Sequence, residues 1–212
     1  MFIIDFDGTI YDTHLFIKDI YDVLIRFGVS VIDANKTMKT AILLEGNLHY
    51  GYTFDRQLDD LLDLGYVFDR GQVLGSLMSI TENKDYTSKD AIIFLEKLKT
   101  FGLPLVLLTA GDKTFQMMKF ESTQMPLYFD TVECVFGDKD KYVESVYTKG
   151  QQIFFINDKE LENIEVKKSC PAAEVVTKHN PYKVVANTGE DFGLPTFESL
   201  LDIATYVREK IS

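Results

Sequence analysis

The sequence predicts an α/β fold in which a three-layer, parallel-sheet core carries a small all-helical insertion. Short, uniformly apolar segments alternate with helical patterns in the second half of the chain, which is typical of parallel strands covered on both faces. Near the N-terminus, a stretch of roughly seventy residues has only helical periodicity. Because this stretch follows a first strand, we expect it to interrupt a single core domain. Residues 1–13 and 88–212 would form the core, and residues 14–87 would form the helical unit.

The elements follow from local patterns, in order along the chain. Residues 2–4 are apolar and predict the first strand. Helical periodicity then predicts four helices, at about 15–27, 33–45, 54–64 and 69–79. Thr53 is expected to cap the third of them. The predicted core continues with helix 88–101, strand 103–108, helix 115–120, strand 132–136, helix 141–147 and strand 153–156. Further strands are expected at 175–176 and 184–186, before a final helix that is capped by Thr196 and runs to about 210.

Composition excludes several classes of function. The chain has 33 acidic and 22 basic residues and a net charge of -11, so its field repels nucleic acid. No apolar run approaches the length of a membrane span, and the N-terminus lacks a basic, cleavable leader. Cys134 and Cys170 form no metal-binding spacing and are typical of a reducing compartment. We therefore expect a cytoplasmic protein that binds neither nucleic acid nor membrane.

The most informative segment is Asp5-Phe6-Asp7-Gly8-Thr9-Ile10-Tyr11-Asp12, which follows the first strand directly. Alternate side chains of a strand share a face, so we expect Asp5 and Asp7 to point the same way and Gly8 to let the backbone turn. Clustered carboxylates need a compensating cation, and their hard oxygen atoms favour Mg²⁺. Asp-Gly can also be a simple turn signal. Three carboxylates within eight residues favour the metal site.

Other polar residues follow two later strands. Thr109-Ala110-Gly111 could bind a phosphoryl oxygen, Asn157-Asp158 could supply a metal ligand, and Lys139 or Lys141 could supply a positive charge. Each feature alone has an ordinary explanation, as a strand-terminal hydroxyl, a turn or a solvated lysine. Ligands of parallel sheets bind beyond the carboxyl ends of the strands, so their joint occurrence there favours a binding site.

In these segments the chain resembles the haloacid dehalogenase superfamily of phosphohydrolases. Residues 5–12 resemble its DxDGTxxD motif, and residues 107–109 resemble its second motif. We prefer Lys141 over Lys139 as the lysine of the third motif, because Val143 and Val146 follow it on the inward face of a helix. Residues 156–163 resemble the fourth motif, with Asn157 in place of its usual first acid and Asp158 as the ligand. The resemblance implies a Rossmann-like core and a cap in the place of the helical unit.

The resemblance also implies a mechanism for a Mg²⁺-dependent phosphatase acting on a small phosphorylated metabolite. Asp5 would be the nucleophile and form an aspartyl-phosphate. Asp7 would be the general acid and base, with a carboxyl held partly neutral by its neighbours. Mg²⁺ would bind Asp5, the backbone carbonyl of Asp7, and Asp158. Thr109, the amide of Ala110, and Lys141 would hold the phosphoryl oxygens.

Other functions stay open at this point. A phosphotransferase or mutase would use the same residues, and Asn157 also allows a catalytically weak module that binds phosphate or protein. A phosphoacceptor receiver domain is less favoured, since its acceptor would follow an internal strand. The segment 47–52 is either a specificity element of the cap or a surface loop. His14 lies near the expected site, although we favour a surface role for it.

Overall fold

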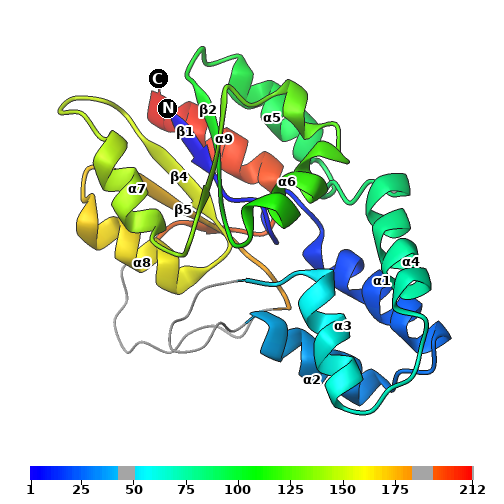
Figure 1. Ribbon diagram of the computed structural model, residues 1–212. Coiled ribbons are helices and arrows are strands. Elements are labelled where there is room, and N and C mark those ends of the chain that lie inside the picture. The colour runs from blue at the N-terminus through cyan, green and yellow to red at the C-terminus, as the bar shows by residue number, and fades with distance from the viewer. Residues whose placement is uncertain (43–50, 183–192, 212) are drawn as a thin grey trace.

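The computed structural model describes residues 1–42, 51–182 and 193–211, and it has the predicted α/β architecture. Its six-stranded sheet is parallel throughout, in the order β3-β2-β1-β4-β5-β6 (Figure 1). The strands are β1 (Phe2–Ile4), β2 (Leu105–Ala110), β3 (Thr131–Val135), β4 (Phe154–Asn157), β5 (Glu174–Lys178) and β6 (Thr196–Phe197). β1 lies at the centre, so β2 and β4 follow it on either side and place their carboxyl ends next to its own.

Helices cover both faces of the sheet because alternate strand residues point to opposite sides. Ile3 of β1 packs in a cluster with Val143 and Val166, from the helices α7 (Lys139–Val146) and α8 (Glu160–Ser169). Phe2 and Ile4 pack instead toward the helices of the other face, which are α5 (Ala91–Lys99), α6 (Lys113–Glu121) and α9 (Leu200–Ile211), with the short 3-10 helix Met125–Leu127. The core therefore has three layers.

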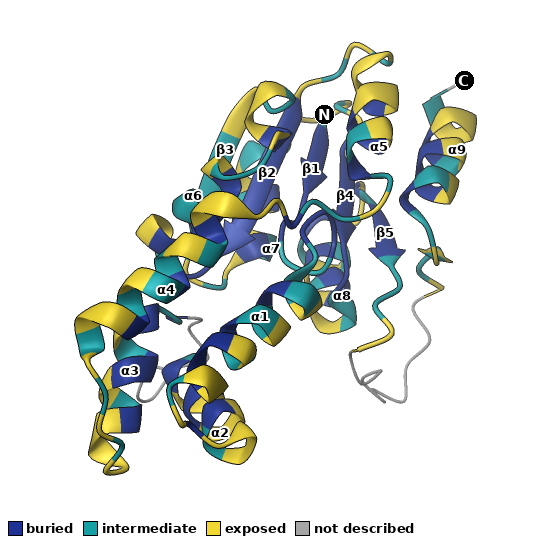
Figure 2. Cartoon of the chain, turned by 90° about the vertical axis from the view of Figure 1, so that its right-hand side faces the viewer, coloured by how far each residue is buried: buried dark blue, intermediate teal, exposed yellow. Residues whose placement is uncertain are grey.

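In the described part of the chain, four helices lie between β1 and α5, beyond the carboxyl edge of the sheet (Figures 1 and 2). They are α1 (Thr13–Arg26), α2 (Val31–Ile42), α3 (Phe54–Asp63) and α4 (Arg70–Asn83). Their apolar faces belong to the same buried cluster as Phe2 and Ile4, so the helical unit packs continuously onto the core. Tyr86, in the segment that returns to the core, donates a hydrogen bond to Asp19 of α1 at 2.7 Å. The exact division at residues 13 and 88 stays a prediction.

Several predicted elements differ in detail. Thr53 caps α3 as expected, accepting a hydrogen bond from the amide of Arg56. Thr196 does not cap the last helix, because it lies in β6, and Ser199 accepts the amide hydrogen bond of Asp202 instead. The strand expected at 184–186 lies outside the described residues. Within the described ranges, no helix has both the length and the hydropathy needed to cross a membrane.

Candidate functional site

A cavity of about 380 Å³ lies where the carboxyl ends of the strands meet the helical unit. Asp5, Asp7, Thr109 and Ala110, which follow or end the central strands, line its core side together with Lys139. The helical unit supplies the opposite wall, which includes Phe16, Ile20, Met38 and Tyr52. Four of the six predicted site residues therefore line one cavity, and Lys141 and Asp158 are not among its lining residues.

Asp5 is the first residue after β1, and its side chain is fully buried. One carboxylate oxygen lies 2.5 Å from the ammonium of Lys139, and the other accepts a hydrogen bond from Thr9 at 3.0 Å. Burial raises the pKa of Asp5, and the charge of Asp158 raises it further, against the effect of Lys139. The charge of this buried carboxylate therefore depends on neighbouring ammonium groups. A carboxylate held in this way can react as a nucleophile with an electrophile that enters the cavity.

The lysine beside Asp5 is Lys139, and the preference for Lys141 was wrong in geometry. α7 begins at Lys139, one helical turn before the buried Val143, so these two residues share the inward face. Lys141 is out of phase with them; its side chain is 70% exposed and pairs with Asp138 at 2.8 Å. Burial opposes the charge of Lys139, but Asp5 and Glu162 outweigh burial and raise its pKa, so it stays cationic.

Asp7 is held by a second buried lysine that the motif does not contain. The ammonium of Lys119, in α6, lies 2.6 and 2.8 Å from the two carboxylate oxygens of Asp7. Thr13, in the first turn of α1, donates a further hydrogen bond at 2.8 Å. Burial opposes the charge of Asp7, but Lys119 and these hydrogen bonds lower its pKa to about 2. The expectation of a partly neutral carboxyl was therefore wrong, because an adjacent cation keeps it ionised.

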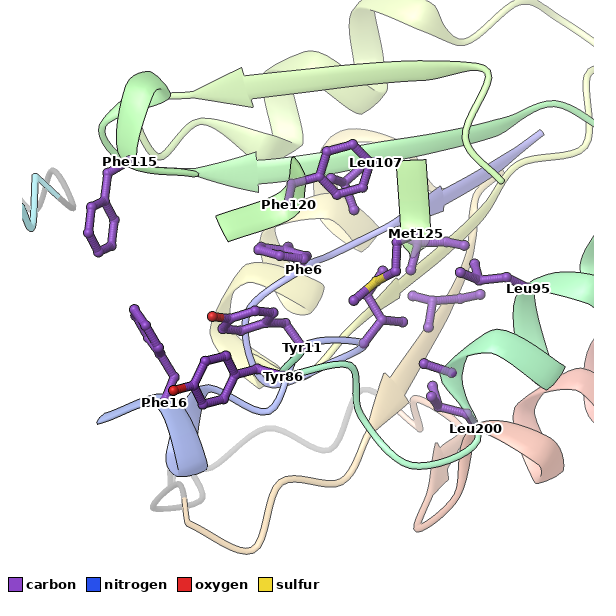
Figure 3. Packing of buried hydrophobic residues seen from close by; sticks show 14 of the residues in the cluster. Phe6, Tyr11, Phe16, Tyr86, Leu95, Leu107, Phe115, Phe120, Met125 and Leu200 are labelled. Atoms are coloured by element: carbon purple, nitrogen blue, oxygen red, sulfur yellow. The ribbon is translucent and has the colours of Figure 1, made fainter. Parts of the chain in front are cut away.

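Aromatic rings surround the ammonium of Lys119. It lies between 5.0 and 5.8 Å from the ring centres of Phe6, Tyr11, Phe16 and Phe115. Figure 3 shows these four rings close together, beside the carboxyl end of the sheet. Faces of aromatic rings attract cations, so these rings are favourable neighbours for the ammonium group. The sequence holds one signal for it: Lys119 follows Phe115 by four residues, which places a charge on the apolar face of the helix.

The two aspartates contact different helices. The expectation that they point the same way assumed that the strand continues through them, but β1 ends at Ile4 and the chain turns at Phe6. Asp5 contacts the first residue of α7, and Asp7 contacts α6 from the other layer. Both still line the cavity. The turn thus gives each carboxylate its own ammonium partner.

Thr109 and Ala110 end β2, adjacent to Asp5 across the sheet. Thr109 is 1% exposed, and both residues line the cavity. Gly111 follows with a φ of 142°, a conformation that residues with a side chain rarely adopt. Asp112 then caps α6, accepting a hydrogen bond from the amide of Phe115 at 2.9 Å. This turn places a hydroxyl and the start of a helix beside the aspartates, as a phosphate site requires.

Asn157 and Asp158 occupy the end of β4. The amide nitrogen of Asn157 donates to Glu162 at 3.1 Å and to Asn163 at 3.0 Å, both on α8. Glu162 in turn lies 2.8 Å from the ammonium of Lys139, and Lys139 and Lys159 outweigh its burial and lower its pKa to about 2. An acid at position 157 would lie beside the carboxylate of Glu162 and repel it. The amide of Asn157 instead binds Glu162, which contacts Lys139. Glu162, like Lys119, had no role assigned from the sequence.

The residues present fit a magnesium ion in the chemistry of their donor atoms. Asp5 and Asp158 are buried carboxylates close enough for the charge of one to raise the pKa of the other. Asp158 also packs against Gly8, where an added Cβ would lie 2.1 Å from a carboxylate oxygen. The described residues form no cluster of three or more metal-binding side chains. That is compatible with Mg²⁺, which commonly takes one or two carboxylates and keeps several waters.

Two further expectations concern the rim of the site. Residues 47–50 of the proposed specificity segment 47–52 lie outside the described residues, whereas Tyr52 lines the cavity. His14 is exposed and also lines the cavity, stacked on Tyr182 with ring centres 3.7 Å apart. His14 therefore belongs to the edge of the site and has an aromatic partner from the core.

No family model and no curated protein matches the sequence. Solved structures match it over nearly their whole length. A haloacid dehalogenase-like hydrolase from Burkholderia xenovorans has a TM-score of 0.77 and 18% identity, with 100% of this chain and 97% of that chain covered. The L-2-haloacid dehalogenase of Xanthobacter autotrophicus has a TM-score of 0.68 and 16% identity, with 98% and 97% covered.

A third similar structure is a haloacid dehalogenase-type hydrolase from Bacillus subtilis that was solved with bound magnesium. Its TM-score is 0.65 at 13% identity, and the match covers 97% of each chain. At such low identities, the similarity establishes the fold alone.

Proposed function

We propose that this chain, which has the fold of the haloacid dehalogenase-like hydrolases, is a Mg²⁺-dependent phosphatase of that superfamily acting on a small phosphate ester. The observation that carries the proposal is the buried contact between Asp5 and Lys139 at the end of the central strand. A carboxylate and an ammonium in this position can supply a nucleophile and a partner for the phosphoryl group. Thr109, on the adjacent strand, supplies a hydroxyl to the same cavity.

The chain's own residues suggest the steps. Asp5 would attack phosphorus and form an aspartyl-phosphate, while Lys139, Thr109 and the amide of Ala110 hold the phosphoryl oxygens. Asp7 is ionised, so it is ready to accept a proton from the water that hydrolyses this intermediate. The leaving oxygen would receive its proton from the pair of Asp7 and Lys119, whose ammonium carries one.

Asp5, Asp158 and the backbone carbonyl of Asp7 would hold Mg²⁺. When bound, Mg²⁺ would reduce the repulsion between the attacking carboxylate and the phosphate dianion. Glu162 and Asn157 would keep Lys139 in place from the other side. The two cysteines are unpaired in the structure, which supports a reducing, cytoplasmic compartment.

The presence of Asp7 favours phosphoryl transfer over dehalogenation, although one of the similar structures named above is an L-2-haloacid dehalogenase. By resemblance, dehalogenases lack an acid at this position. Here the acid is present, ion-paired and on the cavity wall. A transferase or mutase would share the first step and differ in the acceptor that takes the phosphoryl group from Asp5.

The test is the hydrolysis of p-nitrophenyl phosphate by the whole protein with added Mg²⁺. We expect turnover that Asp5→Asn lowers by at least about 1,000-fold, because the substitution removes the nucleophile. Asp22→Asn is the matched control, since Asp22 forms an exposed pair with Lys18 on α1. Chloride release from 2-chloropropionate is measured in parallel. Equal inertness of wild type and Asp5→Asn toward the phosphate ester would exclude the phosphatase, and chloride release alone would favour a dehalogenase.

A further inference from the structure

Among the residues that the structure describes, the wall of the cavity that faces the predicted site is mostly apolar. Beyond the aspartates, the space is bounded by Phe16, Ile20, Met38, Tyr52 and Phe115. These side chains come from α1, α2, α6 and the segment before α3. A leaving group attached to phosphorus at Asp5 would have to lie against this wall, since the opposite side holds the charged residues.

Tyr52 contributes its ring to the wall, while its hydroxyl is already bound. The hydroxyl donates to the side-chain oxygen of Gln57 at 2.6 Å, and the amide of Gln57 donates to the carbonyl of Ala34 at 2.9 Å. The ring packs edge-on against Phe115, with centres 5.2 Å apart, and Phe115 packs likewise against Phe54 at 5.0 Å. Burial raises the pKa of Tyr52 well above its usual value. This part of the wall therefore presents aromatic surface.

Most of the polar side chains among the described lining residues already have partners within the protein, although the side-chain oxygen of Gln116 has none. Lys119 and Thr13 bind Asp7, and Asp112 caps α6. Asn180 donates to Asp158 at 2.7 Å and accepts a hydrogen bond from the amide of Tyr182 at 3.1 Å. Among the described residues, a leaving group with several hydroxyls would therefore meet mostly apolar surface or polar groups that are already bound. A hydroxyl that is buried without a partner loses its hydrogen bonds to water, which weakens binding.

We propose that the substrate is a phosphate ester with an apolar, ring-sized leaving group, which packs against the surface formed by Phe16, Tyr52 and Phe115. This proposal rests on the proposed phosphatase function and adds the class of substrate. Sugar phosphates are disfavoured by the same wall. Rings in edge-to-face packing form a surface against which a flat apolar group packs well.

Two esters of matched shape test the proposal. Benzyl phosphate and glucose 6-phosphate both release a primary alcohol that carries a six-membered ring, so the chemical step is comparable and the polarity of the ring differs. We expect a kcat/KM for benzyl phosphate at least about 100-fold higher, because an apolar pocket rejects unsatisfied hydroxyls. Titration calorimetry with Asp5→Asn should give the same order of affinities without turnover.

A variant of the wall localises the effect. Met38→Gln keeps the length of the side chain and adds an amide, and Met38→Leu is the apolar control. The glutamine variant should have a kcat/KM for benzyl phosphate about tenfold lower than that of the leucine variant. If Met38→Gln does not fold, the comparison of kcat/KM for the two esters with the wild-type protein still tests the proposal.

The outcomes separate the two proposals. Suppose that the protein hydrolyses p-nitrophenyl phosphate but has a kcat/KM for glucose 6-phosphate equal to or higher than that for benzyl phosphate. This result would overturn the proposal of an apolar substrate and would not affect the proposal of a phosphatase. Inertness toward all three esters would overturn the phosphatase, and the substrate class with it.

Discussion

The ammonium of Lys119 contacts both carboxylate oxygens of Asp7, at 2.6 and 2.8 Å, across the boundary between a core helix and the loop after the first strand. The pair joins the second acid of the motif to a residue that no part of the motif contains. It also keeps Asp7 ionised, with a pKa of about 2. In the proposed mechanism, Asp7 would therefore begin the reaction as a base.

Lys119→Met should raise the pKa of Asp7, because the substitution removes the cation that stabilises the carboxylate while burial remains. The acid limb of the pH profile of kcat/KM should move to higher pH, and kcat should fall by about 100-fold. Lys113→Met, at the exposed start of the same helix, is the control. An unchanged acid limb in Lys119→Met would show that the pair does not set the ionisation of Asp7.

The two candidate lysines of α7 should behave very differently. Lys139→Met removes the ammonium beside Asp5, so we expect phosphatase activity to fall by at least about 1,000-fold. Lys141→Met changes an exposed side chain and should leave activity within about twofold of wild type. Steady-state assays with p-nitrophenyl phosphate compare the two, with circular dichroism to verify folding. Greater sensitivity at position 141 would contradict the geometry.

Gly8→Ala should damage the site as well as the backbone. Gly8 has a φ of 83°, and a Cβ there would lie 2.1 Å from Asp158. Gly65→Ala is a matched control, since its φ is 89° and a Cβ would meet nothing within 4 Å. Both should lose about 1–2 kcal/mol in free energy of unfolding from the left-handed backbone. Only Gly8→Ala should also need more Mg²⁺ for half-maximal activity; equal Mg²⁺ requirements would argue against Asp158 as a ligand.

Asp19 should make stability depend on pH. Burial opposes its charge, but hydrogen bonds from Lys84 and Tyr86 lower its pKa below the ordinary 3.8. Asp19 therefore contributes fully to the free energy of unfolding above about pH 4, and this contribution is lost as the pH falls through the lowered pKa. Asp19→Asn should cost about 1 kcal/mol at pH 7, because the group lies near the surface.

Urea unfolding of Asp19→Asn and wild type at pH 7 and pH 3 measures this contribution. The difference in free energy of unfolding between wild type and Asp19→Asn should be smaller at pH 3 than at pH 7. Asp22→Asn, which removes an exposed pair within the same helix, should show a smaller difference at pH 7. A deficit of Asp19→Asn that grows on acidification would contradict the assignment.

The fold was predictable from the sequence because its signals are local. The apolar runs of β2 and β4 and the helical periodicity of α1 and α3 each lie within 14 residues or fewer, and the structure has these elements close to their expected bounds. Thr196 was assigned wrongly for the same reason, since a cap and a short edge strand share the same residue types.

The site was predictable only where a motif or a strand end marks it. Asp5, Asp7, Thr109 and Ala110 all line the cavity. The choice between Lys139 and Lys141 depends on where α7 begins, and helix starts are poorly defined in sequence. Lys119 could not be assigned to Asp7 because 112 residues separate them in the chain, and no local pattern encodes such a pairing.

The position of β1 at the centre of the sheet sets the order in which the protein can mature during synthesis. Phe2 pairs with Leu105 on one side and Phe154 on the other, and Asp5 lies 134 residues from Lys139. Such distant contacts form late in folding. A nascent chain that has emerged only as far as the helical unit carries both aspartates with neither of their lysines. The proposed site can therefore be complete only once the chain has been synthesised past β4.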